Sequence, residues 1–396
     1  MVFISISKFL LIVLGTGVLL FSRRFPTPDR QLKGMSTPIA VLLVLLAFAL
    51  SLFWTVAPQA DALGSWVKYG KLIMVLLLVI LIRDRREAIY ALSAFAAAQV
   101  FLLASSWMLF VHLPVPWATS RMALTEYAVF SSYLDQGIMS AVFAALCWHL
   151  RELVPGQFGR SLAIFVAFAA VANILFVLMG RTAHVVSIVL ISLAIMWELP
   201  KKYRPLMVLL PFFLALGLFF ASSKVRDRMT LVQTEVLAYS AQKTADTSSG
   251  IRLDLWKTAV QAIGEHPITG SGIGSWSTQF NRLQHEKNPA HVDIDGNGNP
   301  HQEFFLWGVQ LGIPGILMFM ALLFSIWRDT LKFPTPYARA TQSTLIALAV
   351  ACLFNSSLYD AQIGDFFCVL IGLLLALGRL SILEQPIAQP HLQQPA

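Results

Sequence analysis

Four residues in this sequence are best suited to chemistry: His301, Arg252, Arg181 and Arg121. His301 follows Pro300 and directly precedes a long apolar run, so it lies at the N-terminal edge of a predicted helix. The positive end of a helix disfavours an imidazolium, and a neutral imidazole can take a proton from a hydroxyl. His301 is therefore a candidate general base. The alternative is an interfacial histidine that only caps the helix or forms a hydrogen bond.

The three arginines are candidates for binding an anion. Arg181 stands between two apolar runs with almost no loop, and ionisable residues at membrane depth are costly and usually functional. Arg252 lies in the first turn of a predicted helix over 251–264, where a cation favours an anionic partner. Asp254 or exposure to solvent would satisfy Arg252 equally well. Arg121 lies in a roomier predicted outer loop.

No metal or cofactor is predicted. The segment from Asp293 resembles the start of a calcium loop, but its twelfth position is Phe304 instead of the required glutamate. Asp293 and Asp295 also match a short Asp-x-Asp metal motif that is common by chance. The glycines of 270–274 resemble part of a dinucleotide loop, but no strand precedes them, so they predict a tight turn. Three further side chains are supporting candidates: Lys68, Glu303 and Asp254.

The elements that must position these residues are transmembrane helices. Of the 396 residues, 57% are hydrophobic and 13% charged, and the mean hydropathy is +0.69. Soluble domains carry about 25% charged residues, so a soluble protein is excluded. Apolar runs of roughly 20 residues are long enough to cross a bilayer. Eleven spans are predicted, at about 4–21, 37–56, 66–82, 88–111, 128–150, 161–179, 182–198, 206–222, 304–327, 339–358 and 363–382.

The net charge of +8 reflects topology and does not indicate nucleic-acid binding. Sixteen of the 29 lysines and arginines fall in alternate loops, beginning with Arg23–Lys33 and Arg83–Arg86. Such alternation is typical of cytoplasmic loops. It places the long loop 223–303 outside, which is the periplasm in a Gram-negative cell. Eleven spans put the N-terminus outside and the C-terminus inside, and a twelfth would change only these ends.

We therefore expect an all-α polytopic integral membrane protein with 11–12 transmembrane helices and one large, mainly helical periplasmic loop. Within that loop, helices are predicted over 224–240 and 251–264, whereas 265–300 is rich in Gly, Pro and Asn and predicts mostly turns. The predicted regions are 1–222 with transmembrane helices 1–8, the loop 223–303, the C-terminal transmembrane helices of 304–383, and a disordered cytoplasmic tail of 384–396.

The order of the motifs resembles the O-antigen ligase and polymerase superfamily, and most closely the WaaL-type O-antigen ligases. The residues that carry the resemblance are Arg121, Arg181 in Gly-Arg-Thr, Arg252-Leu-Asp-Leu-Trp256-Lys-Thr-Ala259, His266-Pro267-x-x-Gly270-x-Gly272-x-Gly274, and Pro300-His301-Gln-Glu-Phe-Phe-Leu306 with Gly312. Two features depart from the family. Gln302 stands where Asn or Ser is more frequent, and members usually have about twelve spans.

The resemblance implies a glycosyltransferase in the bacterial inner membrane, with its active site facing the periplasm. The implied donor is an O-antigen linked to undecaprenyl diphosphate, and the acceptor is lipid A–core oligosaccharide. Arg121, Arg181 and Arg252 would bind the diphosphate in place of a metal, since arginine binds phosphate bidentately. His301 would deprotonate the acceptor hydroxyl in one inverting displacement.

Three alternatives remain. An O-antigen polymerase or a protein O-oligosaccharyltransferase would share the donor and differ in the acceptor. A large C-terminal periplasmic domain would favour the protein transferase, and only about a dozen residues follow the last predicted span. A transporter of lipid-linked sugars would place charged residues near mid-membrane in both halves. Here the candidates gather toward one face, which favours an enzyme.

Overall fold

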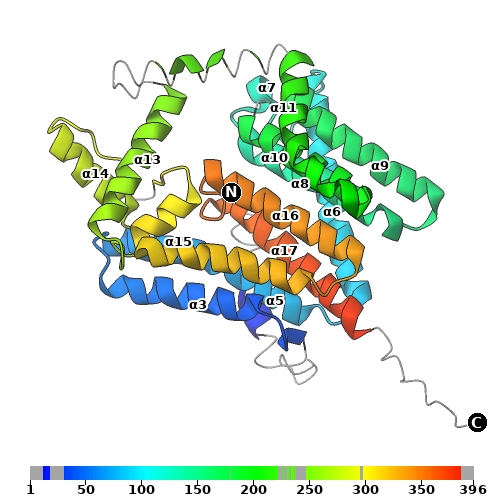
Figure 1. The fold of residues 1–396 in the computed structure, drawn as a ribbon, viewed down its shortest axis with the longest axis horizontal. Coiled ribbons are helices and arrows are strands. Elements are labelled where there is room, and N and C mark those ends of the chain that lie inside the picture. Colours follow the sequence, from blue (N-terminus) through cyan, green and yellow to red (C-terminus); the bar gives the residue numbers. More distant parts are fainter. Residues whose placement is uncertain are drawn as a thin grey trace, which may run out of the picture.

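The described part of the chain is built from helices, and no strand occurs in it. The computed structural model describes residues 12–17, 31–178, 180–221, 247–294 and 298–384, with a few single positions between 226 and 237. Figure 1 shows most of the helices packed side by side, with α13 and α14 at one end of the bundle. The first of these helices are α3 (Thr37–Leu50), η1 (Ser51–Phe53), α4 (Gln59–Tyr69), η2 (Gly70–Leu72), α5 (Ile73–Leu81), α6 (Arg85–Phe110), α7 (Ala123–Glu126), α8 (Tyr133–Leu150), η3 (Arg151–Leu153) and α9 (Gly156–Ala172).

The second half of the chain continues the bundle after a short π-helical segment. This segment, η4, joins α9 to α10. The remaining helices are η4 (Asn173–Val177), α10 (Arg181–Glu198), η5 (Lys201–Leu209), α11 (Leu210–Ala221), α13 (Ser248–Glu265), α14 (Trp276–Lys287), α15 (Glu303–Thr330), α16 (Thr335–Phe354) and α17 (Ala361–Leu383).

Seven described helices are long and apolar enough to cross a membrane, counting α4 to α5 and α9 to η4 as one span each. Each of the seven corresponds to a predicted span, and α3 with η1, α8 and α11 correspond to three more. The chain is therefore a polytopic membrane protein, as predicted. Of the first predicted span, 4–21, the structure describes residues 12–17, which are helical. The rest of that span, and residues 385–396 of the predicted tail, lie outside the described residues.

Helix α17 lies at the centre of the bundle. It is apolar on all sides and most of its residues are buried, as expected of a helix surrounded by protein. It packs against α5, α6 and α16, while α8 packs against α9, α10 and α16. Helix α9 is peripheral and exposes Phe158, Phe165 and Phe168. An apolar exposed face of this kind suits contact with lipid.

Helix α15 is broken near its start, and the loop before it fills the break. Gly312 has φ 71° and ψ −162°, and Pro314 follows, so helical hydrogen bonding stops there. Main-chain groups at membrane depth need partners inside the protein. The carbonyl oxygens of Val309 and Gln310 accept hydrogen bonds of 2.8 and 2.9 Å from amides of segment 267–274. The amide of Ile313 returns a 2.8 Å bond to that segment.

The glycines of segment 267–274 allow this close approach. Gly270, Gly272 and Gly274 all have positive φ, at +62°, +85° and +77°. A Cβ on Gly272 would lie 2.2 Å from the Cα of Thr55, and one on Gly270 would lie 2.4 Å from the main chain of Gln310. The prediction of a tight turn is confirmed, and the turn packs against transmembrane helix ends.

The described part of the long loop contains one helix that the sequence analysis did not predict. The predicted helix over 251–264 is confirmed as α13, whereas most of 224–240 lies outside the described residues. The prediction of mostly turns over 265–300 was wrong for α14. Trp276, Phe280 and Leu283 occupy one face of α14 at helical spacing and are buried. This apolar face makes α14 a stable helix although Gly, Pro and Asn flank it.

Candidate active site

Arg181 is placed by the close packing of α8 against α10. It is the first residue of α10, four positions after the end of the π-helical segment η4, and π-helical turns are frequent at functional sites. The two helices approach closely at Gly137, where a Cβ would lie 2.5 Å from the Cβ of Ala183. The half-buried Arg181 side chain reaches α13, and its Nη1 lies 3.4 Å from the hydroxyl of Ser249. The start of α10 thus meets the start of α13.

Arg252 lies one turn into α13 and points into the same region. Thr247 caps α13 by accepting a hydrogen bond from the amide of Gly250. The Arg252 side chain is half-buried, and its Nη2 lies 3.5 Å from the amide oxygen of Asn355. Asp254 is directed elsewhere, since its Oδ2 accepts a 2.7 Å hydrogen bond from Gln284 on α14. Asp254 is therefore not the partner of Arg252.

His301 sits on a strained turn that the predicted motif itself holds in place. Its φ is +52°, a left-handed value that costs a non-glycine residue roughly 1–2 kcal/mol. Its amide donates to Oδ1 of Asn299 at 2.9 Å. The indole Nε1 of Trp256 donates to the carbonyl of Pro300 at 3.1 Å. Trp256 comes from the same helix as Arg252, so one helix positions both the arginine and the histidine turn.

Electrostatics join the three residues into one site. Burial lowers the pKa of Arg252, and the charge of Arg181 lowers it further. Arginine nevertheless keeps its charge in proteins, so two cations face each other. Burial and then the charge of Arg252 lower the pKa of His301. Solvent still reaches the His301 side chain, yet the surrounding protein is enough to favour the neutral imidazole.

Within the described residues, neither Arg181 nor Arg252 forms an ion pair with a carboxylate. Arg181 also occupies the N-terminus of α10, where the helix dipole adds positive potential. Like charges held together at helix N-termini make a site suited to a multiply charged anion.

Glu303, the first residue of α15, stabilises the helix start that follows His301. This fully buried carboxylate accepts hydrogen bonds from Tyr69 at 3.0 Å and from Trp307 at 2.9 Å. It also accepts from the amides of Leu358 and Tyr359, at 3.0 and 3.1 Å. Glu303 thereby ties the start of α15 to α4 and to the connection between α16 and α17. Its described contacts are structural.

The connection between α16 and α17, residues 355–360, contributes two polar residues that the sequence analysis missed. Asn355 contacts Arg252, and Oδ1 of Asp360 accepts a 3.2 Å hydrogen bond from Asn299 beside His301. Burial raises the pKa of Asp360 to about 7, with smaller contributions from the Asp135 and Glu303 carboxylates. The signal was present, because Asn-Ser-Ser and Asp interrupt the apolar sequence here. The predicted span 339–358 included Asn355, which was therefore treated as part of a transmembrane helix.

Lys68 and Arg121 differ in how they relate to the site. The ammonium of Lys68 lies 4.0 Å from the centre of the Tyr359 ring, so it borders the 355–360 connection. Arg121 is exposed between α6 and α7. In the part of the chain that the structure describes, Arg121 forms no hydrogen bond or ion pair with Arg181, Arg252 or His301.

The fold and this geometry define a polytopic membrane protein with two arginines and a histidine gathered where its helices begin. Residues 164–320 match the O-antigen ligase family. The chain is therefore similar to the O-antigen ligase family over these residues, and the predicted resemblance is confirmed there. This indicates an enzyme of the O-antigen ligase or polymerase type. Among curated proteins, no relative matches the chain.

The matched segment contains Arg181, Arg252 and His301, whereas Arg121, Asn355 and Asp360 lie outside it. Within the described residues, no group of three or more His, Cys, Asp or Glu side chains is placed to hold a metal ion.

Proposed function

We propose that the protein is an O-antigen ligase that transfers a glycan from undecaprenyl diphosphate to a sugar hydroxyl of lipid A–core oligosaccharide. The observation that supports this most is the pairing of Arg181 and Arg252 without a carboxylate, next to a neutral His301. A cationic site of this kind suits a diphosphate, and the adjacent imidazole suits deprotonation of a hydroxyl.

The arginines would hold the leaving group. A lipid diphosphate departs as an anion and needs no proton, so it requires positive charge instead of a general acid. Arg181 and Arg252 would supply that charge together with the N-terminus of α10. Arg121 remains a proposed third contact. A donor long enough to extend from Arg181 and Arg252 to the exposed segment before α7 would contact it.

His301 would activate the acceptor. Its imidazole takes the proton of the acceptor hydroxyl, and the hydroxyl oxygen forms the new bond to the anomeric carbon. The bond between that carbon and the diphosphate oxygen breaks on the opposite face, and the electron pair leaves with the diphosphate. A single displacement inverts the anomeric configuration, and no metal is required in this scheme. General-base catalysis of this kind contributes about 10²–10⁴-fold.

The proposed periplasmic orientation is supported by the two ends of the bundle. Arg85, Arg151 and Arg339, all predicted to be cytoplasmic, lie at the ends of helices away from His301. Arg151 and Arg339 both pair with Glu198, the last residue of α10, which begins at Arg181. Cations thus collect at the end that the positive-inside rule assigns to the cytoplasm.

The proposal can be tested with purified protein in liposomes, supplied with lipid-linked O-antigen and rough lipopolysaccharide. We expect ligated lipopolysaccharide with and without EDTA, and a loss of at least about 100-fold in His301→Ala. His285→Ala is the matched control, because His285 is another exposed histidine of the same loop and lies on α14, outside the motifs that contain Arg252 and His301. Product from His301→Ala at the wild-type rate would refute the base, and loss of product in EDTA would refute the metal-free scheme. Growth of the donor glycan without lipopolysaccharide would identify a polymerase instead.

A further inference from the structure

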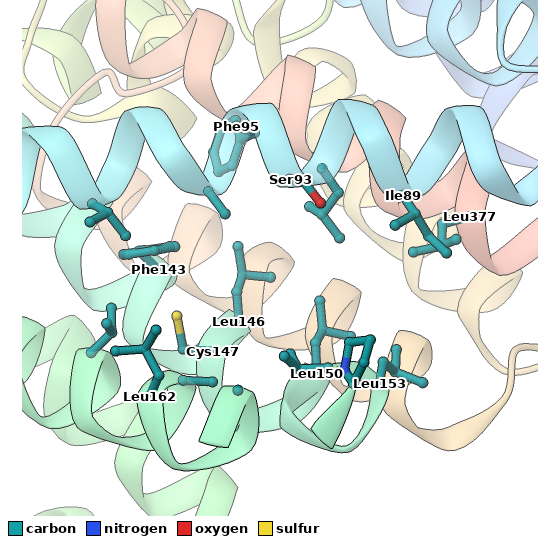
Figure 2. Close-up of a pocket in the computed structure, with 18 of the residues that line it drawn as sticks. Ile89, Ser93, Phe95, Phe143, Leu146, Cys147, Leu150, Leu153, Leu162 and Leu377 are labelled. Carbon is teal, nitrogen blue, oxygen red and sulfur yellow. The ribbon is translucent and has the colours of Figure 1, made fainter. Parts of the chain in front are cut away.

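A second site lies at the end of the bundle opposite His301. It is a cleft of about 400 Å³ between α6, α8 and α9. Figure 2 shows Ile89, Ser93 and Phe95 of α6 facing Phe143, Leu146, Cys147 and Leu150 of α8, with Leu162 of α9 on the same side as α8. Almost every side chain in the lining is apolar. The proposed transfer reaction uses none of them.

The depth of the cleft matches one leaflet of a bilayer. On α8 it runs from Leu150, the last residue of the helix, to Phe143, and on α9 from Gly159 to Val166. Each stretch covers seven helical steps, or roughly 10 Å at 1.5 Å per residue. Half of a hydrocarbon core is about 15 Å. On α6 the lining is longer and runs from Arg85, at the predicted membrane boundary, to Val100, near the middle of the predicted span 88–111. The cleft therefore starts at the membrane boundary and ends near the middle of the membrane.

The chemistry of the rim selects a headgroup. Arg85, the first residue of α6, is exposed and lines the cleft at its outer end. Its Nη2 donates to the neutral hydroxyl of Tyr337 at 3.1 Å, and within the described residues no carboxylate forms an ion pair with it. Glu384 approaches the main-chain amide of Arg85 instead, at 3.4 Å. Nearby Arg83 and Arg160 differ, since each pairs with a glutamate, at 3.0 and 3.2 Å.

We infer that this cleft binds an anionic phospholipid, with one acyl chain between α6, α8 and α9 and the headgroup phosphate on Arg85. The volume fits this occupant. If a methylene takes about as much room as a water molecule in the liquid, roughly 30 Å³, the cleft holds on the order of a dozen methylenes. The cation of Arg85 distinguishes this lipid from a zwitterionic one, because an arginine near an anionic lipid surface contributes attraction that a neutral headgroup lacks.

The first test is competition between lipids. The full-length protein in detergent would receive equal amounts of dioleoyl phosphatidylglycerol and dioleoyl phosphatidylcholine, and native mass spectrometry would count the lipid retained. We expect about fivefold preference for phosphatidylglycerol at the first bound lipid, the effect of roughly one arginine. Arg85→Gln should abolish the preference, whereas Arg160→Gln should keep it. Equal retention by the wild type, or an equal loss in both variants, would overturn the inference.

The second test locates the chain and does not depend on a variant. Phosphatidylglycerol with a photoreactive diazirine halfway along one acyl chain would be bound, irradiated and mapped by peptide mass spectrometry. We expect labelling on the lining of the cleft, around Leu146 of α8 and around Ala163 and Val166 of α9. Labelling spread over the outer face of α9, at Phe158, Phe165 and Phe168, would show annular lipid only and overturn the site. Neither test measures glycan transfer, so its outcome is separate from the proposed ligase activity.

Discussion

Replacing Arg252 by glutamine should separate the two roles that its position implies. Glutamine keeps a polar, uncharged side chain but removes the charge that faces Arg181 and His301. Removing one preorganised donor to a developing negative charge costs about 10²–10³ in kcat, or roughly 3–4 kcal/mol. We expect a loss of this size in transfer at saturating donor. The donor KM should rise as well, because the charge also holds the diphosphate in the ground state.

The same substitution should raise the pKa of His301, which the charge of Arg252 lowers in the wild type. Burial is the larger cause of its lowered pKa, and the charge of Arg252 is the second. In the variant the pKa of His301 should therefore rise toward the ordinary value without reaching it. A lowered pKa keeps an imidazole neutral to more acidic pH, so the wild-type His301 should lose reactivity only at a pH below that of an ordinary histidine. In Arg252→Gln this loss should begin at higher pH.

The rise can be measured without activity. Diethyl pyrocarbonate modifies neutral imidazole, and peptide mass spectrometry resolves each histidine, so the modification rate of His301 against pH reports its pKa. Arg282→Gln is the control, since Arg282 lies on α14 and pairs with Glu265 and Glu286. An unchanged His301 midpoint in Arg252→Gln would refute their electrostatic contact. A wild-type transfer rate in that variant would refute its role in holding the diphosphate.

Three further predictions concern the elements around the site. Gly272→Ala adds a Cβ 2.2 Å from the main chain of Thr55, at a residue whose φ is +85°. We therefore expect thermal unfolding to show a loss of at least about 2 kcal/mol of stability. Gly264→Ala is the control, because a Cβ there meets no atom within 4 Å and should be neutral or stabilising. An unchanged melting temperature in Gly272→Ala would show that the turn is not packed as described. Trp256→Phe removes the 3.1 Å hydrogen bond from the indole to the carbonyl of Pro300, next to His301. We expect kcat to fall about 10–100-fold with little change in donor KM. A rise in KM of the same size would instead indicate a damaged donor site. Burial raises the pKa of Asp360 from 3.8 to about 7, so the folded state loses stability as pH rises from about 4 to about 7 and no further above that value. Asp360→Asn should flatten the fall in melting temperature between pH 4 and 7. A parallel pH dependence in variant and wild type would contradict the buried acid.

Much of the fold follows from local composition. A run of about 20 apolar residues must be a helix in lipid, because no other backbone conformation satisfies its own hydrogen bonds there. The predicted spans agree with the described helices for this reason. Helix α14 was missed because its apolar face is short, and only contact with its neighbours makes that face worth burying.

The candidate site divides in the same way. The sequence by itself determined which residue types are available, and it placed His301, Arg181 and Arg252 near helix starts, where charge and depth make them informative. It could not assign partners. Asp254 was an equal candidate for Arg252, yet α14 holds it through Gln284. Asn355, 103 residues from Arg252, takes that place instead.

Only the tertiary structure decided these pairings, because they depend on how whole helices pack. The close packing of α8 and α10 at Gly137 positions the start of α10, whose Arg181 contacts α13. The buried Glu303 accepts hydrogen bonds from the 355–360 connection and so holds it close to His301. The same packing leaves Arg121 exposed. A side chain's chemistry is local, but its electrostatic neighbours are set by contacts between segments far apart in the chain.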